Sequence, residues 1–336
     1  MSATPPNIGA AKPLDPPQRA GVMVIAGVVV VLLAVLIAGE NAIVAQRMQH
    51  LPRLATDFSA TYLDRELQAL AEEPPQTVFL GDSVLWGYGV PAGDIAVARL
   101  SARGLTAENL AFKAANPAND FFLLRLLHDR GVRPRRVVLE INQQVFNPFD
   151  QSYRALHPGV LALARPLLTP ADVRRLRVAP DAGPQAALER AASNLWLVYG
   201  MRSDLRESLF ERLPTPPPHI ASDMFAMTYD QAPLRKSNVG LVYLRATAAL
   251  LASTHTPALA FLTPVNHALL HEFIDNPQYG ANKRRLVEAL REHGIATVDF
   301  DSALPSRDFF DNDHLNPQGQ RDLAELLAGA LAKTKL

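Results

Sequence analysis

The chain has 336 residues, of which 48% are hydrophobic, enough for one large domain or two modest ones with a sizeable core. Its 33 Lys and Arg residues balance its 33 Asp and Glu residues, so no global charge steers the chain toward nucleic acid, and we predict no nucleic-acid partner. The sequence contains no cysteine, which excludes disulfides, thiolate nucleophiles and Cys-ligated zinc and leaves packing as the source of stability.

The N-terminal region predicts a membrane segment. Residues 1–20 are rich in Pro, Ala and Gly, which indicates a disordered tail. Residues 21–39, "GVMVIAGVVVVLLAVLIAG", carry no charge and are long enough to cross a bilayer as a helix. The alternative is a cleaved signal peptide. We favour an uncleaved anchor, because the run is longer than the typical signal core of about 7 to 15 residues and no clean A-x-A cleavage site follows it.

The orientation of this span follows from its position more than from charge. Lys12 and Arg19 precede the span while Arg47 and Arg53 follow it, so the positive-inside count is nearly balanced. With one span near the N-terminus and a large domain after it, we expect a single-pass protein of the inner (cytoplasmic) membrane. Its tail at residues 1–20 would be cytoplasmic and its large domain extracytoplasmic.

Residues 40–75 have helix-forming composition and are predicted to be a helical stalk. Their apolar residues recur at helical spacing, and two consecutive prolines end the pattern. The residues concerned are Tyr62, Leu63, Leu67 and Leu70, followed by Pro74 and Pro75.

The remaining residues, 76–336, alternate short apolar runs with helical patterns. The runs lie at 77–80, 109–112, 137–141, 258–262 and 296–300. Strands that alternate with helices predict a parallel sheet covered on both faces, a three-layer α/β/α fold with five strands. A mostly helical insertion is expected at about 150–240. Asn119 and Thr169 are expected to cap helices, the latter with Pro170 in the first turn.

A serine follows the first of these strands in "FLGDSVLWGYG", residues 79–89. Ligands of open parallel sheets bind beyond the carboxyl ends of the strands, so Ser83 is placed where a reactive hydroxyl would be accessible. Gly81 allows the sharp turn that this placement needs. Taken alone, Gly-Asp-Ser is equally well explained as an ordinary turn.

A serine nucleophile needs a base, and the base needs a group that orients it. Of the nine histidines, His314 has the most suitable context, because Asp311 lies three residues before it in "FFDNDHLNPQG". Asn316 and Pro317 are predicted to cap and open the last helix, which would anchor the loop that carries His314. An ordinary cap with a surface histidine would explain Asn316 and Pro317 but not the Asp-x-x-His pattern.

Together the two blocks resemble the SGNH or GDSL hydrolase superfamily over about residues 76–330. The resemblance implies a flavodoxin-like SGNH fold in which Ser83 is the nucleophile, His314 the general base and Asp311 its partner. It also implies an oxyanion hole that includes the N–H groups of Ser83 and Ala114, the latter at a position where the family usually has glycine. Asn142 or Gln144 would supply the side-chain donor, and the sequence leaves the choice between them open.

The N-terminal anchor and the helical insertion are similar to one membrane-anchored, extracytoplasmic branch of that superfamily. This branch includes the D-alanine transfer protein and proteins of polysaccharide O-acetylation, which implies a partner of the membrane-bound O-acyltransferase kind. Asn266 and His267, after the fourth strand, are candidate substrate contacts. His267 and His271 have metal-binding spacing but no third ligand and no HExxH pattern, so we predict neither metal nor cofactor.

The resulting hypothesis is a membrane-anchored serine esterase or O-acyltransferase that works through an acyl-serine. Its substrate would be an ester of a cell-envelope glycan or a lipid-linked compound. The alternative is a membrane-tethered binding or assembly factor of envelope polysaccharide modification that keeps the fold without turnover.

Overall fold

The computed structural model describes residues 16–47, 53–147, 155–180, 183–209, 225, 228–229 and 232–334. Five parallel strands form one sheet in the order β2-β1-β3-β4-β5, which is the predicted α/β fold. The strands are β1 (Thr77–Leu80), β2 (Ala107–Asn109), β3 (Arg136–Ile141), β4 (Ala258–Leu262) and β5 (Ala296–Asp299). The inner strands β1 and β4 are buried along their whole length, as continuous apolar runs in a sheet covered on both faces should be.

The chain reverses its direction across the sheet at β1, because β2 lies on one side of β1 and β3 on the other. Thr77 pairs with Ala107 of β2 on one side and with Arg136 of β3 on the other. Strand β2 begins and ends earlier than the predicted run at 109–112. It ends at Asn109, because the Asn109 side chain accepts a hydrogen bond from the Ala111 N–H at 3.2 Å and turns the chain.

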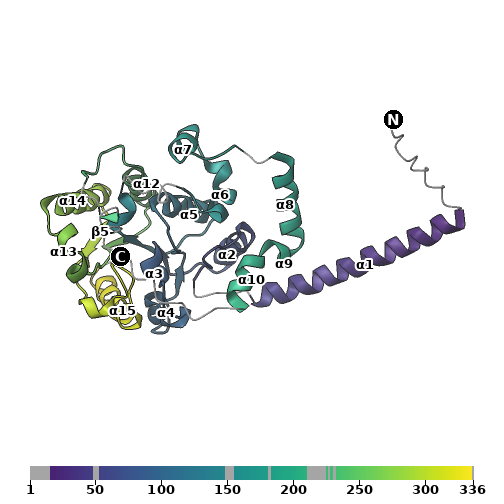
Figure 1. The fold of residues 1–336 in the computed structure, drawn as a ribbon, viewed down its shortest axis with the longest axis horizontal. Helices are drawn as coiled ribbons and strands as arrows, with labels where there is room; N and C mark the ends of the chain where they lie inside the picture. Colours follow the sequence, from purple (N-terminus) through teal and green to yellow (C-terminus); the bar gives the residue numbers. More distant parts are fainter. Residues whose placement is uncertain are drawn as a thin grey trace, which may run out of the picture.

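Two helical layers enclose the sheet (Figure 1). On one face α5 packs against α12, and α12 packs against α14; on the other face α4 packs against α15. Their bounds are α4 (Ala96–Ser101), α5 (Pro117–Asp129), α12 (Val239–Ser253), α14 (Pro277–Arg291) and α15 (Pro317–Lys333). Two short helices, α3 (Ser83–Trp86) and α13 (His267–Ile274), follow β1 and β4 at the carboxyl end of the sheet.

The helix caps confirm two of the three predictions. Thr169 forms a capping box with Asp172 at the start of α7, and Asn316 caps α15. Helix α5 is capped by Asn116 instead of Asn119, because Pro117 fits the first helical position, where no N–H is needed. The Asn119 side chain accepts from the His157 N–H at 2.9 Å.

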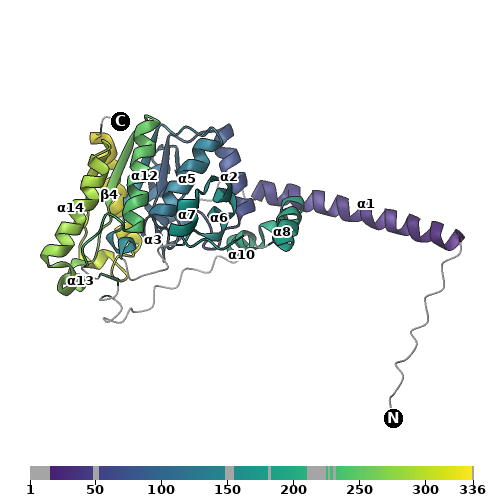
Figure 2. The same ribbon diagram turned by 90° about the horizontal axis from the view of Figure 1, so that it is seen from above.

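Helix α1 (Pro16–Arg47) projects away from the globular part of the protein (Figure 2). It is longer than the predicted span at 21–39, and its stretch Ala20–Gln46 is long and apolar enough to cross a membrane, as a span or as a signal sequence. Residues 16–20 of the predicted tail belong to this helix, while residues 1–15 lie outside the described residues. The last turns of α1 contact the domain: Val44 is 5% exposed and belongs to the main core.

Helix α2 (Ala60–Glu72) belongs to the globular core, which corrects the predicted stalk at 40–75. Tyr62, Leu63 and Leu67 are buried in the main hydrophobic cluster, and the helix packs against α5 and α6. The helical spacing of its apolar residues was visible in the sequence. Their partners were not, because those partners come from distant parts of the chain.

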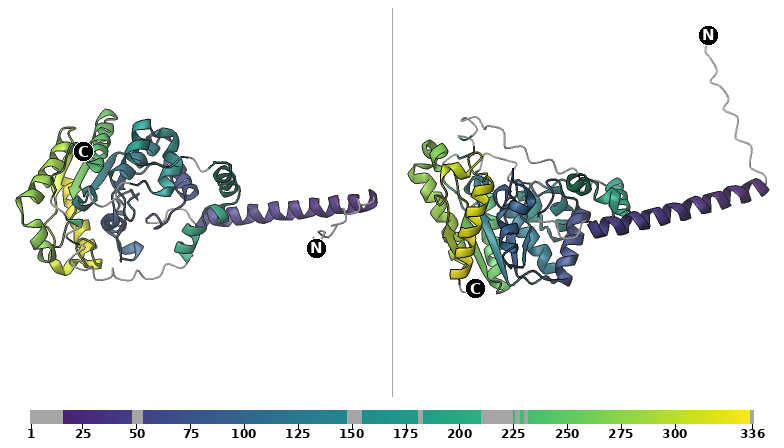
Figure 3. Two further views of the ribbon diagram at one scale, coloured as in Figure 1. Left: turned by 45° about the horizontal axis from the view of Figure 1, so that its top comes forward. Right: turned by 90° about the horizontal axis from the view of Figure 1, so that it is seen from below.

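The described part of the insertion at about 150–240 is mostly helical. Helix α6 (Pro158–Ala164) packs on α2 and α5, and α7 (Pro170–Arg175) follows it. Helices α8 (Gly183–Leu195), α9 (Leu197–Gly200) and α10 (Arg202–Leu209) lie at the side of the domain from which α1 projects (Figure 3). Most of residues 210–231 lie outside the described residues.

Candidate active site

Ser83 is the first residue of α3, at the carboxyl end of the buried strand β1. Asp82 caps this helix by accepting from the Val84 N–H at 3.1 Å. The Ser83 residue is 7% exposed. The short helix and its cap therefore fix the direction of the hydroxyl.

The carboxylate of Glu140, which was not predicted from the sequence, binds the backbone of this turn. Glu140 on β3 accepts from the Asp82 N–H at 2.8 Å and from the Leu85 N–H at 3.2 Å, and Thr263 donates to it at 3.1 Å. A side chain at position 81 would overlap Glu140, so Gly81 is needed for the close approach of the two strands' ends. Glu140 lay inside an apolar run, which gave no signal of this contact.

The loop between β5 and α15 carries Asp311 and His314. It closes on itself through the Phe310 N–H, which donates to the His314 carbonyl at 2.8 Å. Asn316 ends the loop by accepting from two N–H groups of the first turn of α15. Asn266, at the start of α13, donates to the Asp311 carbonyl at 3.0 Å and ties the loop to the end of β4.

The fold brings the two distant segments into contact. His314 Nε2 lies 2.9 Å from Ser83 Oγ, and His314 Nδ1 lies 2.8 Å from Asp311 Oδ2. The other carboxylate oxygen of Asp311 accepts from the His314 backbone N–H at 2.8 Å, so the acid holds both the ring and the chain that bears it. A hydroxyl, an imidazole and a carboxylate in this order can activate the serine for attack on a carbonyl.

The charges around His314 favour its protonated form. Burial lowers the pKa of the imidazole, but Asp313, Asp311 and Asp82 raise it by more than burial lowers it. The net result is a pKa of about 9. Burial would raise the pKa of Asp311, yet its hydrogen bond to His314 and the charge of His314 lower it below its ordinary value. The pair is therefore ionised at neutral pH, with the proton on the imidazole.

A second layer of buried acids lies under the site. Burial raises the pKa of Asp82 to about 6, and burial also raises the pKa values of Asp120, Glu140 and Asp313. Asp313 stands closest to the imidazole, with Oδ1 at 3.6 Å from His314 Nδ1. Buried carboxyl groups that crowd together favour the neutral form, so these acids share fewer negative charges than their number suggests.

Of the two predicted side-chain donors of the oxyanion hole, Asn142 has both amide hydrogens engaged, while Gln144 has one of its two engaged. Asn142 donates its two amide hydrogens to Asp82 and Asp313, both at 2.9 Å, and Gln144 donates to Asp313. Within the described residues the backbone N–H groups of Ser83 and Ala114 are donated to no other group. Ala114 has φ 59°, the left-handed conformation that glycine adopts more readily.

Comparisons with known proteins find distant likenesses among solved structures. No protein-family model and no curated protein matches the sequence. Similar solved structures include an alpha/beta hydrolase enzyme from the metagenome of Lake Arreo, Spain, at 15% identity and TM-score 0.40, covering 76% of this chain and 94% of that one. Two mutants of an acetylxylan (acetyl-xylooligosaccharide) esterase from Geobacillus stearothermophilus show 12% and 13% identity and TM-scores of 0.39 and 0.37, each covering 76% of this chain and 92% of theirs. These neighbours are hydrolases and esterases, and the likeness concerns the fold alone.

The predicted substrate contacts lie at the edge of the loop that holds the site. Asn266 is buried and bound to that loop, while His267 is partly exposed and contacts Asp301 at 3.1 Å. Tyr88 lies nearer to the imidazole, with its ring centroid 4.7 Å from that of His314, and the Lys113 ammonium lies 4.9 Å from the Tyr88 centroid. Tyr88 therefore borders the imidazole, and Lys113 lies over the Tyr88 ring.

Asp311, Asp313 and His314 could each offer one ligand atom to a metal, since these atoms lie within 4.8 Å of one another. Both ring nitrogens of His314 already have partners in Ser83 and Asp311, and Asp313 accepts from Asn142, Gln144 and Asn312. The hydrogen bonds thus account for the cluster without an ion.

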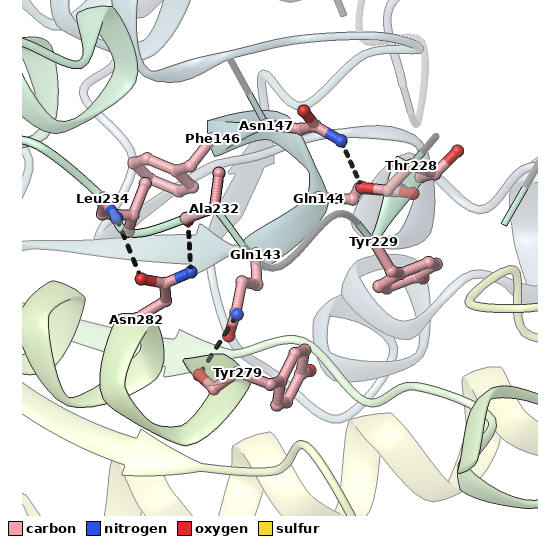
Figure 4. Close-up of a pocket in the computed structure, with 10 residues that line it drawn as sticks. All are labelled: Gln143, Gln144, Phe146, Asn147, Thr228, Tyr229, Ala232, Leu234, Tyr279 and Asn282. Atoms are coloured by element: carbon pink, nitrogen blue, oxygen red, sulfur yellow. Dashed lines mark hydrogen bonds between the residues drawn. The ribbon is translucent and has the colours of Figure 1, made fainter. Parts of the chain in front are cut away.

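A pocket lined by Gln144, Tyr229 and Tyr279, among others, does not include Ser83 or His314 in its walls (Figure 4). Its walls are joined by amide side chains. Asn147 donates to the Thr228 carbonyl at 2.9 Å, and Asn282 accepts from the Leu234 N–H at 2.9 Å and donates to the Ala232 carbonyl at 3.0 Å. These bonds fasten the end of the insertion to β3 and α14, so we assign the pocket a structural role.

Proposed function

We propose that this chain is a membrane-anchored serine esterase or O-acyltransferase that acts on an ester of a cell-envelope glycan or lipid-linked substrate. The observation that supports the chemistry is the continuous hydrogen-bonded chain from Ser83 through His314 to Asp311. Ser83 and His314 are 231 positions apart and lie at hydrogen-bonding distance. If these residues served only a local turn and a local helix cap, they would not have to meet.

In the proposed reaction Ser83 Oγ attacks the acyl carbonyl carbon while its proton moves to His314 Nε2. The oxyanion of the tetrahedral intermediate accepts from the N–H groups of Ser83 and Ala114. The alcohol leaving group departs with the proton from His314, leaving an acyl-serine. Water or a glycan hydroxyl then attacks the acyl carbon in the same way and releases Ser83. Asp311 holds the imidazole and stabilises its cation throughout.

Tethering to the membrane is supported by how α1 ends. Val44 of this helix is buried in the main core and Asn41 bonds to both sides of the junction between α8 and α9, so removal of the whole of α1 would cost the domain these contacts. An uncleaved anchor in the inner membrane explains a helix that is exposed over most of its length and packed at its end. A membrane-bound O-acyltransferase is the partner that this arrangement would suit.

The competing function is a tethered binding or assembly factor without turnover. The commitment of both Asn142 amide hydrogens to Asp82 and Asp313 favours it, because each donor missing from an oxyanion hole weakens catalysis by about a hundredfold to a thousandfold.

Labelling the purified protein with a fluorophosphonate probe separates the two functions. We expect the wild type to label, and Ser83→Ala or His314→Ala to lower labelling or ester turnover by about a thousandfold to a millionfold. Ser302→Ala is the matched control, because Ser302 is exposed and outside the site. A wild type that does not react, or equal labelling of Ser83→Ala, contradicts the enzymatic proposal and leaves the assembly factor.

A further inference from the structure

Helix α8 exposes an apolar face that the rest of the described chain does not cover. Leu188 is 72% exposed and Leu195 is 69% exposed, and outside α1 no other large hydrophobic residue of the described residues exceeds 39%. The two leucines are seven residues apart, so they lie on the same face of the helix, together with Ala191. Arg190 and Glu189 point to other sides. A soluble surface helix would normally turn its leucines to the core.

The carboxyl end of α8 is fixed where the apolar part of α1 ends. Trp196 donates its indole N–H to Glu40 at 2.6 Å. Asn41 donates to the Leu195 carbonyl at 3.0 Å and accepts from the Leu197 N–H at 2.8 Å. Glu40 is the first charged residue after the uncharged run 21–39, so these bonds place α8 at the level where that run stops.

The direction of α8 fits a surface that lies across α1. In Figure 1 α8 runs across the direction of α1, and in both views it lies on the side of the domain from which α1 projects (Figures 1 and 2). If α1 passes through a bilayer, a helix that crosses it at the end of the apolar run lies along the plane of that bilayer.

The residues that follow α8 have the composition of a membrane boundary. The rings of Trp196 and Tyr199 stack with centroids 6.3 Å apart, and the Arg202 guanidinium lies 4.6 Å from the Tyr199 centroid. Tryptophan and tyrosine gather at the headgroup level of membranes because one end of each ring is apolar and the other polar. Arginine at this level reaches phosphate groups while its stem remains apolar.

We propose that α8 is an interfacial helix whose Leu188 and Leu195 enter the headgroup and acyl boundary of the same bilayer that α1 spans. The lipid of that bilayer is the occupant of the apolar face, as the continuity with the exposed apolar surface of α1 indicates. The inference depends on the anchoring part of the proposed function and is independent of the chemistry at Ser83. Two contacts with the membrane, one spanning and one lying on it, would hold the domain in one orientation.

The absence of cysteine makes the test direct, since one introduced cysteine gives one labelling site. The full chain is reconstituted in nanodiscs of phosphatidylcholine and phosphatidylglycerol, and a polarity-sensitive fluorophore is attached to Leu188→Cys. Arg190→Cys, on another side of the same helix, is the matched control, and Leu32→Cys reports on α1. We expect lipid-borne nitroxide to quench the label at 188, and quenching by aqueous iodide to be at least about threefold weaker there than at 190.

Each other result overturns a different statement. If iodide reaches the labels at 188 and 190 equally while the label at 32 is protected, α1 spans the bilayer and the interfacial role of α8 is wrong. If the label at 32 is also open to iodide, the anchoring itself is wrong. Protection at 188 in native membranes but not in nanodiscs would identify a protein as the occupant and overturn the assignment to lipid.

Discussion

At the scale of single residues, the protonation of His314 controls the proposed chemistry. Its pKa of about 9 means that at pH 7 about one imidazole in a hundred is neutral and able to accept the serine proton. We therefore predict that the rate of fluorophosphonate labelling rises with pH and levels off above about pH 9 to 10. Labelling rates measured from pH 6 to 10 check this, and a profile that is flat or falls over this range would contradict it.

Asp313→Asn tests the cause of the raised pKa. Removing the carboxylate at 3.6 Å from His314 Nδ1 should lower the pKa of the imidazole and move the profile by about one unit toward lower pH. The raised pKa of His314 also makes the free energy of unfolding of the wild type depend on pH. A raised pKa stabilises the folded state below the unfolded value of about 6.5, and this contribution is lost as the pH rises through about 9. A profile that Asp313→Asn leaves unmoved would assign the shift to Asp311 and Asp82 alone.

What could be predicted at this scale depends on how local the signal is. Ser83, Asp311 and His314 stand in short blocks whose residue types carry their own meaning. The directions of Asn142 and Gln144 were not predictable, because both amides turn toward Asp313, a residue about 170 positions away. Their roles depend on which buried acid the fold brings to them.

At the scale of elements, the serine turn depends on the neighbouring strand β3. Glu140→Ala leaves the N–H groups of Asp82 and Leu85 without an acceptor in a buried place, so we predict a loss of about 2 to 4 kcal/mol in the free energy of unfolding. Labelling of Ser83 should also fall. Glu140→Gln keeps an oxygen for these donors and should remain close to the wild type in urea unfolding and in labelling.

Gly81→Ala approaches the same contact from the other strand. Its methyl group would push Glu140 away from the turn, so its labelling defect should resemble that of Glu140→Ala. Gly93→Ala is a control, because a methyl group at position 93 meets no atom within 4 Å. Normal labelling of Gly81→Ala would show that the turn does not need Glu140.

The element boundaries show the same dependence on distant contacts. The strands β1, β3 and β4 were predictable because they are buried runs with few alternatives. The end of β2 and the cap of α5 were misplaced, since each is decided by one asparagine side chain among several. Helix α2 had the right pattern, but its place in the core was not visible from spacing alone.

At the scale of the whole molecule, the sequence specified an α/β domain behind an apolar helix but not how the two are joined. The sequence predicted a spanning helix at 21–39 followed by a helical stalk at 40–75 that would hold the domain away from it. In the structure α1 continues to Arg47 and enters the domain, where α9 packs against it. This junction depends on Asn41, Val44 and Trp196, which no motif connects.

The joint between α1 and the domain should therefore contribute to the stability of the domain even without a membrane. We predict that a truncated chain beginning at Glu40 has a higher urea midpoint than one beginning at Arg53. The free energy of unfolding should differ by about 2 to 4 kcal/mol, because the longer chain keeps the buried Val44 and the two hydrogen bonds of Asn41. Val44→Ala in the longer chain should remove part of this difference, whereas Ile43→Ala, at a residue 61% exposed, should not. Equal midpoints for the two chains would mean that the end of α1 does not stabilise the domain.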